Sequence, residues 1–276
     1  MKRIFFLFFL FPFLAKAQPD IAQRGKWREL GPVSTPENSN LSDYMYTRIG
    51  GPGRLIFVEF DERLPERIFT GSPTGGLFVS DDRGQSWRVG GTDYLMIPGV
   101  SHIQVAPESS DTWFIASGDG DTDFSFSIGV ARTKDGGQTW EWINGKDGSL
   151  PHTDFKKPWE VVRIRKLFVD PQNGNRLWAA TTEGLYATEN ALDAADDVKW
   201  KMVAEGVFQD IIEQPGSNGN ILLAGGDAVW FSSNSGSSFE RLDLPGDFAA
   251  VTDDLPEKRF TLRISADDPY LLYVAY

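Results

Sequence analysis

An octet of turn-forming residues occurs three times in the chain. It reads Ser/Thr-x-Asp/Asn-x-Gly-x-Ser/Thr-aromatic, and each copy follows an apolar run. The Asp or Asn can accept hydrogen bonds from turn amides, the Gly can take a positive φ, and the aromatic ring can pack against a neighbouring sheet. The octet therefore predicts a β-hairpin connection with a structural role. Its residues are Ser80, Asp82, Gly84, Trp87, Thr133, Asp135, Gly137, Trp140, Ser232, Asn234, Gly236 and Phe239.

The octets belong to a longer repeat unit. Two apolar strands precede the strand that leads into each octet, one strand follows it, and the first strands lie at 55–60, 103–107, 167–171 and 211–215. Four strands recurring at a spacing of roughly 40–50 residues are typical of a β-propeller blade. One interval is longer because it contains the loop-forming insertion 144–160. The sequence predicts an all-β fold, an incomplete propeller of about four four-stranded blades plus part of a fifth.

The third unit departs from the octet. It keeps Thr188 and Asn190 but lacks the glycine, and residues 191–198 come before the aromatic Trp200. We expect a longer loop here in place of the tight turn.

The N-terminus predicts export. Lys2 and Arg3 precede the apolar run 4–14, and small residues follow up to Ala17, which together form the three parts of a secretory signal peptide. The apolar run is too short to span a bilayer comfortably. We therefore expect cleavage after Ala17, a secreted or cell-surface protein, and no membrane span after cleavage.

The predicted domain organisation follows from these features. Residues 1–17 are the signal peptide, 18–53 an N-terminal segment, and 54–276 the blades. Within the N-terminal segment, 27–32 reads as a fourth strand without its first three, a strand that would close the ring. The fifth unit stops after two strands at Tyr276, so we expect a longer protein with further blades.

Charge and cysteine content exclude several classes of partner and linkage. The formal net charge is −12, which disfavours nucleic acid and anionic membranes as partners. The chain has no cysteine, so it forms no disulfide despite the predicted export.

The octets, together with the stretch 71–82, resemble the Asp-box (BNR) repeat β-propellers, a superfamily that includes the sortilin N-terminal domain and the xyloglucanases. Within this superfamily, they resemble the exported proteins of Bacteroidetes type. This resemblance covers most of the mature chain. It implies a non-catalytic binding or scaffold domain for a protein or glycan ligand. The alternative that it implies is a glycoside hydrolase, xyloglucanase-like or sialidase-like, with catalytic carboxylates on other blades.

The glycosidase branch of the family places a catalytic Asp before the Gly-Gly that opens the third strand of the first blade. In this chain Pro73 stands at that place, before Gly75 and Gly76. Proline can neither donate nor accept a proton, so the pair of carboxylates that such hydrolysis needs is incomplete. We therefore predict no catalytic residue among the blades of this chain, with Asp119, Asp121, Asp123 or Asp154 as the local candidates under the hydrolase alternative.

Asp119, Asp121 and Asp123 form the best candidate metal site, because their alternating carboxylates could wrap around Ca²⁺. The loop is not an EF-hand, since Phe124 and Val130 stand where Gly and Glu would be required. The alternative is a solvated acidic turn. We expect no other cofactor.

Four residues are candidates for contacting a ligand at the rim of the propeller. His152 and Trp159 lie in the long insertion, and Tyr46 and Arg48 precede the first blade. Exposed aromatics can stack on sugar rings, whereas the alternative is that Trp159 merely packs its loop.

Overall fold

In a computed structural model the chain forms two compact units, Met1–Pro52 and Gly53–Tyr276. The structure describes residues 54–121, 127–153, 161–225, 228–242, 260–265 and 267–275, all in the second unit. The predicted signal peptide and the predicted ring-closing strand at 27–32 lie outside the described residues.

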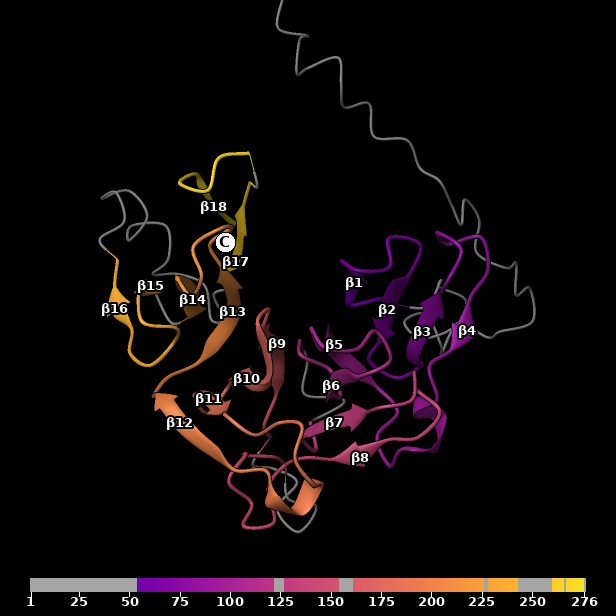
Figure 1. Ribbon diagram of the computed structural model, residues 1–276. Coiled ribbons are helices and arrows are strands. Elements are labelled where there is room, and N and C mark those ends of the chain that lie inside the picture. The colour runs from indigo at the N-terminus through magenta and orange to yellow at the C-terminus, as the bar shows by residue number, and fades with distance from the viewer. Residues whose placement is uncertain are drawn as a thin grey trace, which may run out of the picture. The chain divides into compact units, whose positions relative to one another are not determined.

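The described residues form an incomplete β-propeller, as the repeat predicts (Figure 1). The first blade contains β1 (Phe57–Phe60), β2 (Ile68–Ser72), β3 (Gly76–Ser80) and β4 (Arg88–Val89). The second contains β5 (Val100–Val105), β6 (Trp113–Ser117), β7 (Val130–Thr133) and β8 (Glu141–Trp142). The third contains β9 (Ile164–Asp170), β10 (Asn173–Thr181), β11 (Leu185–Thr188) and β12 (Trp200–Ala204). The fourth contains β13 (Phe208–Glu213), β14 (Ile221–Gly225), β15 (Ala228–Ser232) and β16 (Glu240–Arg241), and β17 (Thr261–Ile264) pairs with β18 (Leu272–Ala275) in a fifth sheet.

Within each four-stranded blade the strands are antiparallel and follow chain order. Middle strands such as β6 and β14 are buried along their whole length, because neighbouring blades pack on both of their faces. This explains why they read as continuous apolar runs instead of alternating patterns. Short 3-10 helices in the described connections are η3 (Thr92–Tyr94) and η4 (Ala195–Asp197). Among the described residues, no helix has the length and apolar character that crossing a membrane would require.

The three octets form the same hydrogen-bonded turn. In the second blade, Thr133 Oγ1 donates to Asp135 Oδ1 (2.7 Å) and accepts from the backbone N–H of Gly137 (3.0 Å). Asp135 also accepts from the N–H (2.8 Å) and the hydroxyl (2.6 Å) of Thr139. Gly137 has φ = 88°, a conformation that favours glycine. Corresponding bonds connect Ser80, Asp82, Gly84 and Ser86 in the first blade, and Ser232, Asn234, Gly236 and Ser238 in the fourth.

The third blade keeps part of this turn although it lacks the glycine. Thr188 Oγ1 donates to Asn190 Oδ1 (2.9 Å). Asn190 Oδ1 also accepts from the N–H of Lys199 (3.0 Å), the residue before Trp200. Asn190 Nδ2 donates to the carbonyl of Asp197 (2.9 Å). The side chain of Asn190 therefore ties together both ends of a longer loop that contains η4.

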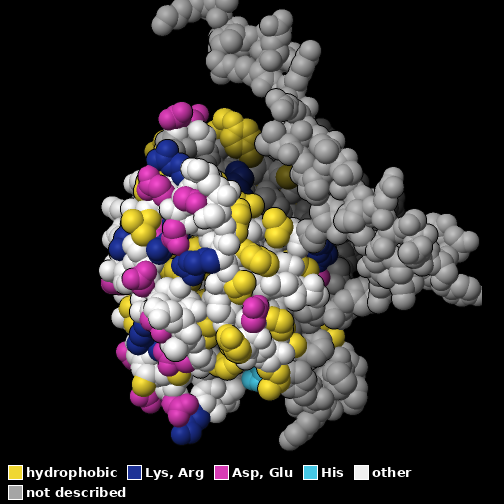
Figure 2. Space-filling model, turned by 90° about the vertical axis from the view of Figure 1, so that its right-hand side faces the viewer, with side chains coloured by type: hydrophobic (Ala, Val, Ile, Leu, Met, Phe, Trp, Pro, Cys, Tyr) yellow, Lys and Arg dark blue, Asp and Glu magenta, His cyan; other side chains and the backbone are white. Residues whose placement is uncertain are grey.

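One position on the inner strands shows how the blades pack. Ile103, Leu167 and Ile211 point into interfaces with a preceding blade and are 1%, 0% and 1% exposed. Val58 stands at the equivalent position of the first blade, because it pairs with Thr70 as Ile103 pairs with Ile115. The side chain of Val58 is 54% exposed. Apolar side chains gather in a band on the face of the molecule that Figure 2 shows.

Polar contacts connect consecutive blades at the turns after their inner strands. The guanidinium of Arg63 donates to Ser110 Oγ (3.0 Å), and Glu108 accepts from the N–H of Gly174 (2.7 Å). The side chains of Gln172 and Asn218 make a third contact (3.0 Å), and Gln214 donates to the carbonyl of Pro269 in a fourth (2.8 Å). Each of these contacts joins one blade only to the next.

Candidate functional site: a cleft between the third and fourth blades

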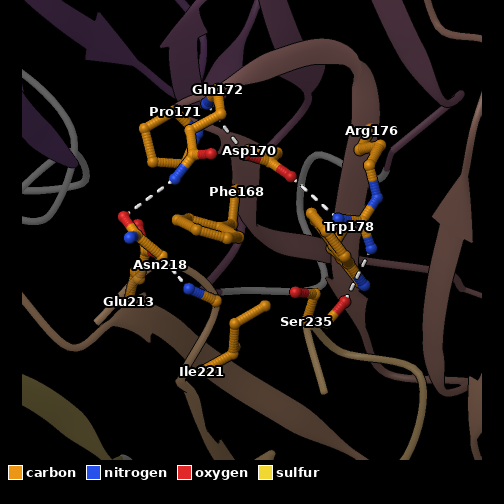
Figure 3. A pocket seen from close by; sticks show the side chains of 11 residues that line it. Phe168, Asp170, Pro171, Gln172, Arg176, Trp178, Glu213, Asn218, Ile221 and Ser235 are labelled. Carbon is orange, nitrogen blue, oxygen red and sulfur yellow. Dashed lines mark hydrogen bonds and ion pairs between the residues drawn. The ribbon is translucent and has the colours of Figure 1, made fainter. Parts of the chain in front are cut away.

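A cleft of about 90 Å³ lies between the third and fourth blades, on the side where the octet turns lie. The third blade contributes Phe168 and Trp178 from facing positions of β9 and β10. The fourth blade contributes Glu213, from the end of β13, and Ile221, from the start of β14. Figure 3 shows the Phe168 ring between the Gln172–Asn218 pair on one side and Trp178 on the other.

Arg176 forms one wall of the cleft and is held by three partners. Its guanidinium donates to Asp170 (2.8 Å), to Glu189 (3.0 Å) and to the carbonyl of Ser235 in the fourth-blade octet (2.8 Å). It also lies over the Trp178 ring, with its central carbon 5.1 Å from the ring centroid. The charge of Asp170 is therefore compensated inside the protein, and Arg176 fixes the octet turn against the third blade.

Glu213 is the acidic group of the cleft that lacks such compensation. It accepts a hydrogen bond from the N–H of Gly219 (2.7 Å), and no lysine or arginine among the described residues forms an ion pair with it. Burial raises the pKa of the Glu213 carboxyl, and the negative charges of Asp170 and Glu62 raise it further against the opposing effect of the Gly219 N–H. The cleft thus contains a carboxylate in negative surroundings.

The indole N–H of Trp178 is a second unusual feature. Trp178 is 2% exposed, and its indole nitrogen has no hydrogen-bond partner among the described residues. The ring packs against Gly236 of the fourth-blade octet, where an added Cβ would come within 2.9 Å of it. An unpartnered buried N–H is uncommon in a folded protein.

The interface between the first and second blades is packed by a tryptophan from the other side. Trp113 pairs with the first octet residue Thr133, just as Ile221 pairs with Ser232, so the two residues are equivalent. Trp113 fills its interface: its ring makes an edge contact with Phe69 (4.9 Å between centroids), Arg67 lies over it, and its N–H donates to the carbonyl of Ser110 (2.6 Å). At the interface between the third and fourth blades, Ile221 stands at this position, and Trp178 of the third blade packs against the octet glycine Gly236, as Trp113 packs against Gly137.

A second cleft, of about 210 Å³, lies between the outer strands of the same two blades, lined by Val203, Trp230 and Phe239 among others. In the second and third blades, the aromatic before or at the start of the fourth strand is a tryptophan that donates its N–H to the preceding blade: Trp140 to the carbonyl of Gly90 (3.0 Å) and Trp200 to that of Ile143 (2.7 Å). Phe239 has no N–H and is smaller. This interface is therefore open at two places.

Charged groups on the inner strands form a separate polar network. His102 Nε2 lies 3.1 Å from Glu59 Oε1, and His102 Nδ1 accepts from the N–H of Leu167 (3.3 Å), a pattern that requires the neutral ring. Burial lowers the pKa of His102, and Lys166 lowers it further despite the Glu59 hydrogen bond. Lys166 in turn pairs with Asp210 (3.2 Å). These groups join neighbouring blades, and none of them lines either cleft.

The candidate metal and ligand residues that the structure describes, Asp119, Asp121 and His152, do not line this cleft. Asp119 is buried, pairs with Arg54 and accepts from the N–H of Asp121 (2.9 Å). No group of three or more potential metal ligands occurs among the described residues. His152 is exposed, and its Nδ1 lies 3.0 Å from the carbonyl of Leu150. The remaining candidates lie outside the described residues: Tyr46, Arg48, Asp123, Asp154 and Trp159.

Sequence reasoning missed Glu213 and its neighbours. The available signal was a difference between repeat units: the second strand of the second blade begins with Trp113, whereas that of the fourth begins with Ile221.

Comparison with known proteins supports the fold. No protein-family model and no curated protein matches the chain. Similar solved structures include the GH74 enzyme of Niastella koreensis (TM-score 0.56, 17% identity, 83% of this chain and 34% of that one) and an ancestral GH74 enzyme (0.54, 17%, 72% and 25%). YCF48 bound to the D1 peptide is similar as well (0.50, 14%, 81% and 62%). The chain thus spans about a third and a quarter of the two GH74 enzymes, and these likenesses show a propeller fold.

Proposed function

We propose that the chain is a secreted Asp-box propeller that serves as a non-catalytic binding or scaffold domain for a protein or glycan ligand. The observation that carries this proposal is the environment of Pro73. It is buried in the turn between β2 and β3, and an added Cβ at Gly99 would overlap its carbonyl oxygen. The place where the resembling xyloglucanases have a catalytic Asp is therefore closed by backbone packing against the second blade.

The similar solved structures include proteins of two functional kinds, a peptide-binding protein and glycoside hydrolases. YCF48 was solved with a peptide bound, which supports protein binding by a propeller of this kind. The GH74 enzymes support the alternative of a glycoside hydrolase with carboxylates on other blades. Against a local catalytic acid, the carboxylate of Asp119 is already paired with Arg54 and buried, whereas a general acid or base has to reach its substrate.

An assay on xyloglucan and on a sialoside tests this choice. We expect no release of reducing sugar or sialic acid by the purified protein. Turnover that is lost in Asp119→Asn or Asp121→Asn, but kept in the control Asp147→Asn at an exposed turn, would establish the hydrolase alternative.

Export is tested by the N-terminus of the protein produced in a bacterium. We expect the exported form to begin at Gln18, and a variant without residues 1–17 to stay in the cytoplasm. An exported protein that still carries residues 1–17 would contradict cleavage.

A further inference from the structure

We infer that the cleft between the third and fourth blades binds the ammonium group of a lysine side chain from a protein partner. This inference rests on the proposed binding function and names the chemistry of its ligand. The cleft has a carboxylate without a cationic partner among the described residues, aromatic and aliphatic walls, and a volume that fits a small group.

Charge decides that the ligand group is a cation. Glu213 faces the cleft without an ion pair among the described residues, while Arg176 already compensates Asp170. The guanidinium that lines the cleft, Arg176, is already bound to Asp170, Glu189 and the carbonyl of Ser235. A bound ammonium would relieve the repulsion that Glu213 experiences.

The walls and the size favour lysine over other cations. Phe168 presents an aromatic ring, and Ile221 an aliphatic surface, for an ammonium and its methylene stem. A cleft of about 90 Å³ admits the end of a lysine side chain. Arginine prefers a two-oxygen contact with a carboxylate, and Glu213 already uses one oxygen for the N–H of Gly219.

The test uses the purified protein and a minimal probe, Nα-acetyl-lysine-N-methylamide, titrated while the indole N–H signal of Trp178 is followed by NMR. Trp178→Phe assigns that signal. We expect saturable binding that weakens with salt and falls at least tenfold with the Nε-acetylated probe, which lacks the charge. Equal binding of both probes would overturn the inference.

Two substitutions test the site itself. Glu213→Gln should weaken binding at least tenfold, whereas Glu240→Gln, an exposed residue of the same blade outside the cleft, should not. Ile221→Trp should abolish binding with the melting temperature kept, because it supplies the indole that Trp113 places at the equivalent point of the other interface. If this variant misfolds, Ile221→Phe takes its place.

The results separate the inference from the proposed function. Binding of the probe that survives Glu213→Gln, or no binding of the probe by the native protein, rejects the lysine site and leaves a binding propeller in place. Hydrolysis of xyloglucan rejects the proposed function whatever the cleft binds.

Discussion

At the interface between the first and second blades, Trp113 fills the space beside Arg67 and its N–H is bonded. At the interface between the third and fourth blades, Ile221 stands at the equivalent position, Arg176 lies over Trp178 instead, and a cleft remains. Both interfaces have an arginine two residues before an aromatic of the second strand, Arg67 before Phe69 and Arg176 before Trp178, in the same backbone register. The two interfaces differ at two equivalent positions, Trp113 against Ile221 and Phe69 against Trp178, so the strand that carries the tryptophan changes how a blade interface is packed.

The largest expected effect comes from opening the closed interface. Trp113→Ile should destabilise the protein by about 3 kcal/mol, since it removes a fully buried ring and leaves its neighbours without contacts. Urea unfolding measures the change, with Trp113→Phe as a milder control. A loss below about 1 kcal/mol would mean that the interface can collapse around a smaller residue.

A smaller effect is expected from the octet that joins β7 to β8. Asp135→Ala removes the acceptor for Thr133 and Thr139 and should cost about 1–2 kcal/mol without affecting ligand binding. Asp147→Ala, at an exposed turn of the same blade, is the control. Loss of binding at an unchanged melting temperature would instead give this octet a functional role.

The open interface can also be closed on its outer side. Phe239→Trp should stabilise the protein by about 1 kcal/mol, because the larger ring fills part of the second cleft and its N–H can reach a carbonyl at the end of β12, as Trp140 and Trp200 do in their blades. Thermal unfolding measures the gain. A lower melting temperature would show that the two blades are set too close for an indole.

The smallest expected effect is on the stability of the protein at acidic pH. Hydrogen bonds from Ser86 and Ser80 lower the pKa of Asp82 to about 2, and for Asp135 the hydrogen bonds from Thr139 and Thr133 outweigh the effect of burial and lower the pKa as well. In the unfolded chain an aspartate titrates near pH 4, so the stabilisation is present above about pH 4 and is lost as the pH falls through the folded-state pKa.

The fourth-blade octet has Asn234 at this position and does not titrate. The double variant Asp82→Asn/Asp135→Asn should therefore show a flatter loss of melting temperature between about pH 4 and pH 2. An unchanged slope would assign the acid sensitivity to other carboxylates.

The sequence predicted the fold because each blade repeats its pattern within a short stretch. Apolar runs, turn residues and an aromatic at fixed spacing determine four strands without knowledge of distant contacts. The cleft could not be predicted in this way. It depends on how Trp178 of one blade, Ile221 of the next and the ion pairs of Arg176 meet across an interface, and such contacts join residues far apart in the sequence. The acidic loop around Asp119 and the rim candidates remain predictions.

The contacts between blades link each blade only to its immediate neighbours: Arg63 to Ser110, Glu108 to Gly174, and Gln172 to Asn218. Local opening should then follow the rules of a one-dimensional array, in which a unit with two packed neighbours opens less often than a unit with one. Amide hydrogen exchange should accordingly be slowest in β6 and β10, and a disturbance at one blade should fade within one or two blades along the array.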